Sequence, residues 1–292
     1  MVQAFDITFT EERNAHMISL LLATLCSAML SIVMRHSEGR ARSKVAMLGV
    51  NYLTCMILTG CFAGKLDPSA EGFGSMLGMG MINGVFYVSA LLAMQYNIPR
   101  NGVVLPSVFS KTGALMVPLL LSIVLFAEIP SVYQTVGAVL AVAAILMMNY
   151  RKGSNAGSFV ALFVLLLTEG MASSMSKIYQ EVGNGALSDQ FLLFTFTSAF
   201  LICVLLLIRS RECPGAKEVL YGVLIGVPNF VASRLVLLAL ETLPAVIVYP
   251  FRSVGSIVIV TLAGVFLFRE RLSKRQIAAM IVIFAALALL NL

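Results

Sequence analysis

Apolar runs of about 20 residues recur along most of this chain, and they constrain its fold more than any other feature. A helix of that length spans the ~30 Å hydrocarbon core of a bilayer. Of the 292 residues, 59% are hydrophobic and 12% are charged, about half the charged fraction usual in a soluble domain. Because a bilayer accepts an apolar exterior that water does not, the sequence predicts an all-α membrane protein.

Charged and Gly/Pro-rich stretches divide the chain into ten predicted transmembrane helices. They cover residues 17–34, 44–63, 75–95, 101–127, 131–149, 157–181, 190–208, 218–240, 244–268 and 274–291. Fourteen Lys and Arg residues lie in the loops after odd-numbered spans, whereas Arg13 and Lys65 lie on the other side. Since Lys and Arg favour the cytoplasmic side, we expect a multi-pass protein of the cell inner membrane with both termini outside.

An internal repeat divides the chain into two predicted domains, 1–150 and 151–292. A shift of 142 residues aligns 104–149 with 246–291, and among the matches are polar pairs: Glu128 with Glu270, Ser131 with Ser273, and Gln134 with Gln276. The front parts agree more weakly, at a shift of 146 that pairs Asn83 with Asn229. Each half then holds five spans, and an odd number places the two halves in opposite orientations. The sequence therefore predicts two inverted five-helix repeats, a 5+5 architecture found in many secondary transporters.

The chain resembles the EamA-like, ten-span members of the drug/metabolite transporter superfamily. The resemblance covers the full length through the span count, the 5+5 repeat and an F-x-E-x-x-S-x-x-Q junction at 126–134 and 268–276. This junction is also similar to that of the small multidrug resistance proteins. The resemblance implies a central cavity lined by spans one, three, four, six, eight and nine, and it leaves the substrate open. Glu128 and Glu270, at the membrane edge, are expected to cap helices.

Five ionisable residues fall inside predicted spans, where each costs roughly 3 kcal/mol or more. They are Lys111, Glu169, Lys177, Arg234 and Arg252. Four positive charges oppose one negative charge, which favours an anion or the anionic end of a zwitterion. The repeat places Lys111 and Arg252 one residue apart in equivalent helices, a placement similar to the phosphate-binding basic residues of the plastid triose-phosphate translocators. Alternatively, these side chains pair with Glu169 or backbone carbonyls and only hold helices together.

Several further polar residues in the spans are candidates for binding a substrate. Glu169, Ser173 and Lys177 recur at four-residue intervals and form a polar stripe on one helix face. Glu169 is either a proton carrier or a static counter-ion. The uncharged candidates are Asn83, Tyr87, Asn229 and Tyr249, which contact either a substrate or neighbouring helices. The three glycines of the third span, Gly78, Gly80 and Gly84, are expected to allow close helix packing.

These features predict a secondary transporter that moves a small organic acid, amino acid or phosphorylated compound by alternating access. The alternative is a proton-coupled exporter of cationic drugs or metabolites that uses Glu169, and an intramembrane enzyme is a remote third. Because no aspartate lies deep in a span and no Walker motif is present, we expect neither catalysis nor a cofactor or metal. The expected partners are a small-molecule substrate and the lipid bilayer, without nucleic acid, and the expected state is a monomer.

Overall fold

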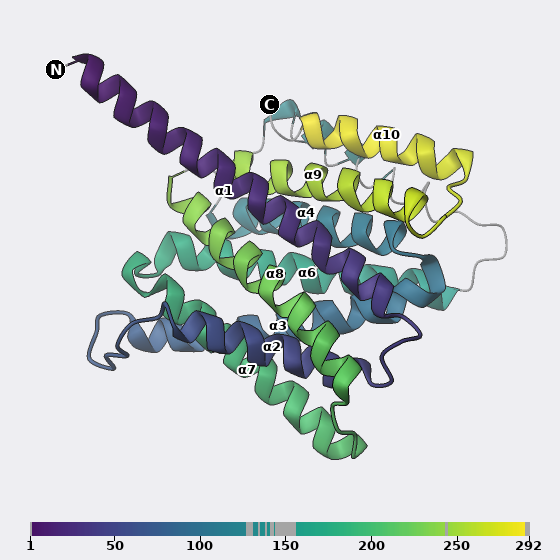
Figure 1. Ribbon diagram of the computed structural model, residues 1–292. Coiled ribbons are helices and arrows are strands. Elements are labelled where there is room, and N and C mark those ends of the chain that lie inside the picture. Colours follow the sequence, from purple (N-terminus) through teal and green to yellow (C-terminus); the bar gives the residue numbers. More distant parts are fainter. Residues whose placement is uncertain are drawn as a thin grey trace.

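The computed structural model describes residues 2–126, 131–133, 135–137, 139–140, 143, 156–242 and 245–289. Throughout these residues the regular structure is helical and no strand occurs. The elements are α1 (Val2–Ser37), α2 (Lys44–Gly60), α3 (Phe73–Asn101), α4 (Val104–Phe126), α6 (Ala156–Val182), η1 (Gly185–Leu187), α7 (Ser188–Ser210), α8 (Ala216–Thr242), α9 (Ala245–Phe266) and α10 (Lys274–Leu289) (Figure 1). The predicted all-helical fold is confirmed for this part of the chain. The predicted fifth span, 131–149, lies mostly outside the described residues.

Five helices in the described part of the chain are long and apolar enough to cross a membrane. They comprise Ile18–Ser37, Phe73–Asn101, Phe159–Val182, Gly185–Ser210 and Ala216–Leu240. Shorter apolar helices cover Lys44–Gly60, Phe251–Phe266 and Ile277–Ala286. Large apolar side chains such as Leu21, Leu205 and Ile281 are exposed on the outside of the bundle. Such a surface suits lipid contact, since water would not solvate it.

The helices before residue 127 and those after residue 155 pack against one another rather than fold as separate bodies. Helix α1 packs against α8 and α9, and α6 packs against α3 and α4 (Figure 1). Helix α2 contacts α7 and α8, and α3 contacts α7 as well as α6. Each of these contacts joins a helix before residue 127 to a helix after residue 155. The interior of the bundle is therefore built from both parts of the chain.

Small residues allow α3 to approach α7 closely. A Cβ atom added at Gly84 would lie 2.4 Å from the Thr195 carbonyl oxygen, and one at Gly80 would lie 2.9 Å from the Phe191 carbonyl oxygen. Since real Cβ atoms do not come this near to backbone, both positions require glycine at this helix separation. Gly78 differs, because a Cβ atom there would meet nothing within 4 Å. The predicted packing role is thus confirmed for Gly80 and Gly84 and wrong for Gly78, which faces outward.

Helix α8 approaches α2 in the same manner. Gly222 and Gly226 are four residues apart and lie on the face of α8 that contacts α2. A Cβ atom at Gly226 would lie 2.8 Å from the Asn51 carbonyl oxygen, and one at Gly222 would lie 2.8 Å from the Met47 carbonyl oxygen. Two glycine pairs with the same spacing therefore set the two closest helix approaches on this side of the bundle.

Glu270 ties the loop after α9 to the beginning of α4. Its carboxylate accepts hydrogen bonds from the backbone N–H groups of Val103 at 2.7 Å and Val104 at 3.4 Å. The Arg35 Nε atom at the end of α1 lies 3.5 Å from Glu270 Oε1. A carboxylate at a helix N-terminus satisfies donors that have no intrahelical partner. The capping role predicted for Glu270 is confirmed, whereas Glu128 lies outside the described residues.

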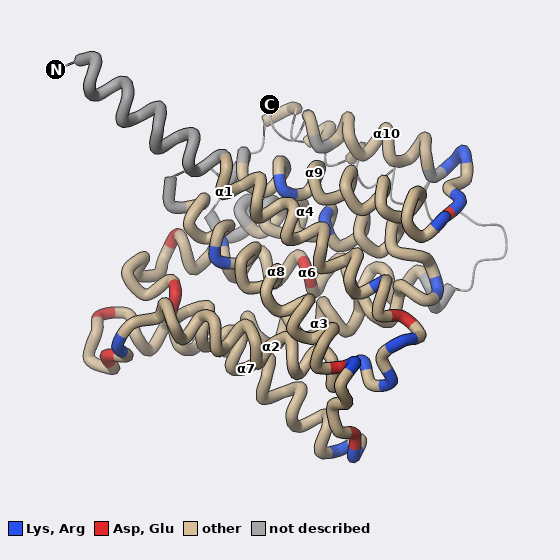
Figure 2. The backbone as a smooth tube through the Cα atoms, in the orientation of Figure 1, with Lys and Arg blue, Asp and Glu red and all other residues tan. Residues whose placement is uncertain are grey.

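Basic residues gather at one end of the bundle. Figure 2 shows most Lys and Arg residues in the loops at the right-hand and lower right-hand edges of the view, around the loops that follow α1, α3, α7 and α9. The loop between α2 and α3, at the opposite end, contains Lys65 alone. Arg151 and Lys152, which the prediction also placed at the basic end, lie outside the described residues.

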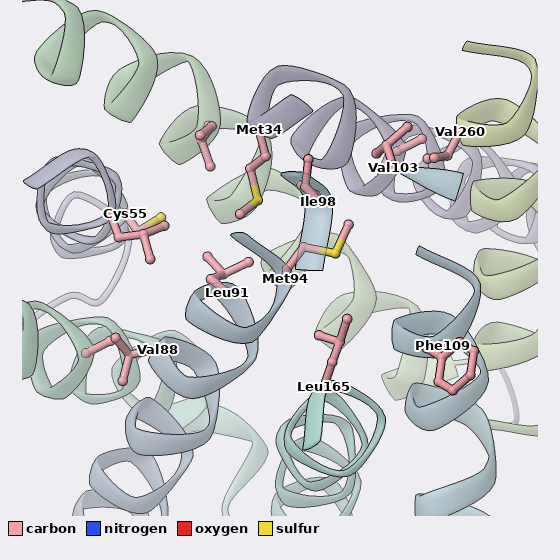
Figure 3. Close-up of a cluster of buried hydrophobic side chains, with 14 of the residues drawn as sticks. Met34, Cys55, Val88, Leu91, Met94, Ile98, Val103, Phe109, Leu165 and Val260 are labelled. Carbon is pink, nitrogen blue, oxygen red and sulfur yellow. The ribbon is translucent and has the colours of Figure 1, made fainter. Parts of the chain in front are cut away.

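A buried apolar core extends along the bundle, from Met34 at the basic end to Met76 and Leu187 at the opposite end. Figure 3 shows part of it, in which Met34, Met94 and Ile98 converge from α1 and α3. Leu91 belongs to the same core, and both Leu91 and Met94 also line the central cavity. The part of the cavity lining that Leu91 and Met94 form is therefore apolar and belongs to the packed core.

Candidate functional site

A cavity lies at the centre of the bundle. Its lining comes from α1, α3, α4, α6, α8 and α9. Seven of the ten predicted site residues line it: Tyr87, Lys111, Glu169, Ser173, Asn229, Tyr249 and Arg252.

Lys111 on α4 lies between two partners from other helices. Its ammonium group donates a hydrogen bond to the Ser27 hydroxyl of α1 at 2.8 Å and lies 4.0 Å from Glu169 Oε1 of α6. The side chain is buried. Gly113, half a turn further along α4, lets α6 come close, since a Cβ atom there would lie 2.1 Å from the Leu166 carbonyl oxygen. The close crossing of α4 and α6 is what brings Lys111 and Glu169 together.

Arg252 on α9 differs from Lys111, because one of its buried nitrogen donors has no hydrogen-bond acceptor among the described residues. Its Nε atom is buried and makes no hydrogen bond with any described residue. An unpaired guanidinium donor that is shielded from water is costly, so it marks a place where a bound group would be stabilised. One turn earlier, Tyr249 donates a hydrogen bond to the Ser173 carbonyl oxygen at 3.2 Å. That bond joins α9 to α6 and fixes the turn from which Arg252 projects.

Uncharged polar groups line the α3 and α8 walls. The hydroxyls of Tyr87 on α3 and Ser233 on α8 lie 3.3 Å apart. Asn229, one turn before Ser233, donates a hydrogen bond to Asn51 Oδ1 of α2 at 3.2 Å. The two asparagines link the cavity wall to α2, so Asn229 has a structural contact in addition to its place in the lining.

Three predicted site residues lie outside the cavity lining. Asn83 is buried between α3 and α7, where it donates to the Thr195 hydroxyl at 3.4 Å. Arg234 bonds Asp189 of α7 through Nε at 2.8 Å and Nη2 at 3.2 Å. Lys177 is half-buried on α6 and is absent from the lining. Asn83 and Arg234 therefore contact α7 and do not line the cavity.

Serines of the lining were missed by sequence reasoning. They are Ser27, Ser31, Ser110, Ser176 and Ser233. Serine is common in membrane helices because its hydroxyl bonds a carbonyl one turn back, as Ser176 does with Ala172 at 3.3 Å. A lone serine therefore carries little signal. The four-residue spacing of Ser27 and Ser31 on an otherwise apolar helix is the one hint that the sequence offered.

Three of the charged residues that the structure describes line the cavity. Lys111 and Arg252 are positive and Glu169 is negative, which leaves one net positive charge. Across the described residues, no group of three or more His, Cys, Asp or Glu side chains is placed to hold a metal ion. The arrangement suits recognition of a small anion by charge-assisted hydrogen bonds.

A helical bundle with apolar outer faces and a charged central cavity is typical of small-molecule transport proteins. In agreement with this, residues 157–292 match the EamA-like transporter family. That family is a multi-pass membrane family of the drug/metabolite transporter superfamily. The resemblance inferred from the sequence is confirmed. Together with the apolar helices, the match identifies a transmembrane protein of a transporter family.

Two further comparisons extend over most of the chain. A Haemophilus influenzae protein described as uncharacterized is 22% identical over 268 residues, which cover 88% of this chain and 91% of that protein. A protein of known crystal structure superposes with a TM-score of 0.62 at 17% identity, over 94% of this chain and 96% of its own. The fold is therefore shared along nearly the full length, including the part that precedes residue 157.

Proposed function

We propose that this protein is a secondary transporter that moves a small anionic or zwitterionic metabolite across the inner membrane by alternating access. The observation that carries the proposal is Arg252, whose buried Nε atom has no partner among the described residues while it lines a cavity with a surplus of positive charge. A cation held without a full set of partners inside a membrane protein is expensive. Binding of an anionic group would offset that cost.

The ten-span, 5+5 inverted repeat is part of this proposal, with repeats at 1–150 and 151–292. Helix contacts support it. When each helix is replaced by the helix five positions further on, the contact of α1 with α8 corresponds to that of α6 with α3, and the contact of α1 with α9 corresponds to that of α6 with α4. The glycine pairs support it too. A shift of 142 residues takes Gly80 and Gly84, which face α7, to Gly222 and Gly226, which face α2. This shift replaces the value of 146 that the sequence suggested for the front parts. Two such halves, rocking about the cavity, give alternating access.

We also propose that the basic end of the bundle faces the cytoplasm and that both termini lie outside. Two exposed cysteines test this orientation. Cys61 follows α2, and Cys213 lies in the loop after α7. A hydrogen bond between the Ser43 hydroxyl and the Glu212 carboxylate places that loop at the beginning of α2. The two cysteines thus lie at opposite ends of the bundle.

In right-side-out vesicles, a membrane-impermeant maleimide is expected to label a variant that retains only Cys61. A variant that retains only Cys213 should be labelled after the vesicles are opened. The reverse pattern would overturn the proposed orientation. Labelling of both before opening would show leaky vesicles, which a cytoplasmic marker enzyme assayed in the same sample detects independently.

Ligand stabilisation of the purified protein tests the anion site. A ligand that binds the folded state raises its melting temperature. We expect carboxylate or phosphate compounds to stabilise the wild type and to lose this effect in Arg252→Gln. Arg234→Gln is the matched control, since it removes the same charge from an arginine that already bonds Asp189. Its ligand response should equal that of the wild type.

The cation-exporter alternative rests on Glu169, which lines the cavity. The distance of 4.0 Å between Glu169 Oε1 and Lys111 Nζ counts against it, because the ammonium already occupies the position of a cationic ligand. Stabilisation by cations alone, lost in Glu169→Gln, would favour this alternative over the anion site. The absence of catalysis and the monomeric state stay predictions.

A further inference from the structure

We infer that the substrate is a monocarboxylate with an uncharged body, so that it carries one net negative charge. This inference rests on the proposed anion site and specifies its ligand. The starting point is the charge of the lining, where the described cationic residues Lys111 and Arg252 oppose the single described acid Glu169. Two positive charges and one negative charge leave a balance of +1. One monoanion brings that balance to zero.

The geometry divides these three charges into a pair and a single residue. Lys111 Nζ lies 4.0 Å from Glu169 Oε1 and donates to the Ser27 hydroxyl at 2.8 Å. Each member of that pair is thus compensated by the other before a ligand arrives. Glu169 lines the same cavity as Arg252, but no described acid forms an ion pair with Arg252, and the buried Nε atom of Arg252 makes no hydrogen bond with a described residue. The uncompensated charge is therefore on Arg252.

A carboxylate is the group that best fits this residue. The guanidinium edge presents planar, parallel donors that match the two oxygens of a carboxylate. Inside the bundle a residual charge is disfavoured, because burial removes the solvation that stabilises ions. A neutral ligand leaves +1 in the site, and a dianion leaves −1. A monoanion alone neutralises it without a change in the Lys111–Glu169 pair.

The rest of the lining fits an uncharged body. Leu91, Met94 and Leu237 contribute apolar surface, while Ser31, Tyr87 and Ser233 contribute hydroxyls. None of these six side chains carries a charge that would balance a second ionic group on the ligand. A short aliphatic or hydroxylated chain attached to the carboxylate matches both kinds of surface.

The test compares ligands that differ in charge but little in shape. Purified wild-type protein is melted with straight-chain monocarboxylates of two to six carbons, with the corresponding amides, and with dicarboxylates of the same lengths. At least one monocarboxylate is expected to bind about tenfold or more tightly than its amide and its dicarboxylate, since the amide lacks the charge-assisted hydrogen bonds and the dicarboxylate leaves a negative charge in the cavity. Affinities come from the concentration dependence of the melting temperature.

Two variants then change the charge of the cavity in opposite directions. Glu169→Gln raises the balance to +2 and should move the preference to the dicarboxylates. Lys111→Met lowers it to zero and should move the preference to the amides. Lys177→Met is the matched control, because it removes a lysine from α6 that does not line the cavity. The order of preference in this control should remain that of the wild type.

The wild-type panel decides the inference even where a variant fails to fold. If dicarboxylates bind the wild type at least as well as every monocarboxylate, the inference is overturned and the anion site survives. The same holds if no monocarboxylate is among the stabilising compounds but another anion, such as a phosphate ester, is. If no anion of any charge stabilises the protein, the proposed function itself fails. An unchanged order of preference in a folded Glu169→Gln protein also overturns the charge rule.

Discussion

Lys111 on α4 and Glu169 on α6 form an ion pair of 4.0 Å inside the central cavity. The two residues are 58 positions apart in the sequence, and the close approach of α4 to α6 at Gly113 brings them together. The two residues compensate each other's charge. Arg252, which lines the same cavity, forms no ion pair with a described residue. The energetic coupling of the Lys111–Glu169 pair is therefore the first property to measure.

Lys111→Met is expected to lower the free energy of unfolding by about 1–3 kcal/mol, because Glu169 loses its counter-ion in a poorly solvated site. Glu169→Gln in the same protein should recover part of this loss, since no uncompensated charge then remains in the pair. Thermal unfolding of the two single variants and the double variant in detergent gives the coupling energy. Purely additive effects would show that the two side chains do not interact.

Arg234 and Asp189 form a second pair, between α8 and α7, outside the cavity. Two hydrogen bonds of 2.8 and 3.2 Å join them, and the Arg234 guanidinium lies 4.1 Å from the centre of the Phe62 ring. Because both side chains are partly exposed, we expect a coupling of about 0.5–1.5 kcal/mol in a double-mutant cycle with Ala. Arg234→Lys should retain less than half of it, since an ammonium does not match both carboxylate oxygens. Full retention in the lysine variant would contradict bidentate pairing.

Glu270 joins the loop after α9 to the N-terminus of α4, and removing its carboxylate should weaken that junction. Glu270→Ala leaves the N–H groups of Val103 and Val104 without acceptors, which costs about 1–3 kcal/mol of unfolding free energy. Glu270→Gln keeps an acceptor and should cost less. As a control, Glu38→Ala removes a surface ion pair with Lys44 and is expected to change stability by no more than ~1 kcal/mol. Equal losses in the two alanine variants would argue against the cap.

Gly84 and Gly78 lie on the same helix and provide a matched test of helix packing. Gly84→Ala places a methyl group against the α7 backbone at Thr195, so α3 and α7 must separate, at a cost of about 1–3 kcal/mol. Gly78→Ala meets open space and gains helix propensity, so its effect should be neutral or stabilising by up to ~1 kcal/mol. The melting temperatures of both variants in detergent test this. A larger loss in Gly78→Ala would show that α3 is rotated from the orientation described here.

Two of the described helices extend well beyond their predicted spans for the same reason. The third span was predicted at 75–95, whereas α3 covers Phe73–Asn101, and the first was predicted at 17–34, whereas α1 covers Val2–Ser37. Hydropathy marks the length of chain that suits a hydrocarbon core. A helix continues beyond that length because its backbone hydrogen bonds are satisfied just as well in the polar interface. Sequence patterns therefore located the helices but not their ends.

The division of site residues into cavity and interface shows what the sequence lacked. All four intramembrane cations were predicted site residues, and the repeat singled out Lys111 and Arg252. In the structure these two line the cavity, while Arg234 pairs with Asp189 and Lys177 lies outside the lining. The partners come from other helices: Asp189 from α7 and Ser27 from α1. Periodicity assigns a residue to one face of its own helix. It carries no information about which helix that face meets.

The sequence by itself determined that this protein is a helical membrane protein of a transporter family. Its apolar runs of about 20 residues suit a bilayer, and the family motifs are short local patterns. The tertiary structure decided which intramembrane charges form pairs, Lys111 with Glu169 and Arg234 with Asp189, and left the buried Nε atom of Arg252 without a partner among the described residues. That difference has a physical cause. Burial of apolar surface depends on composition along the chain, whereas an ion pair of 4.0 Å depends on the separation and rotation of two helices, which small residues such as Gly113 set where the helices cross.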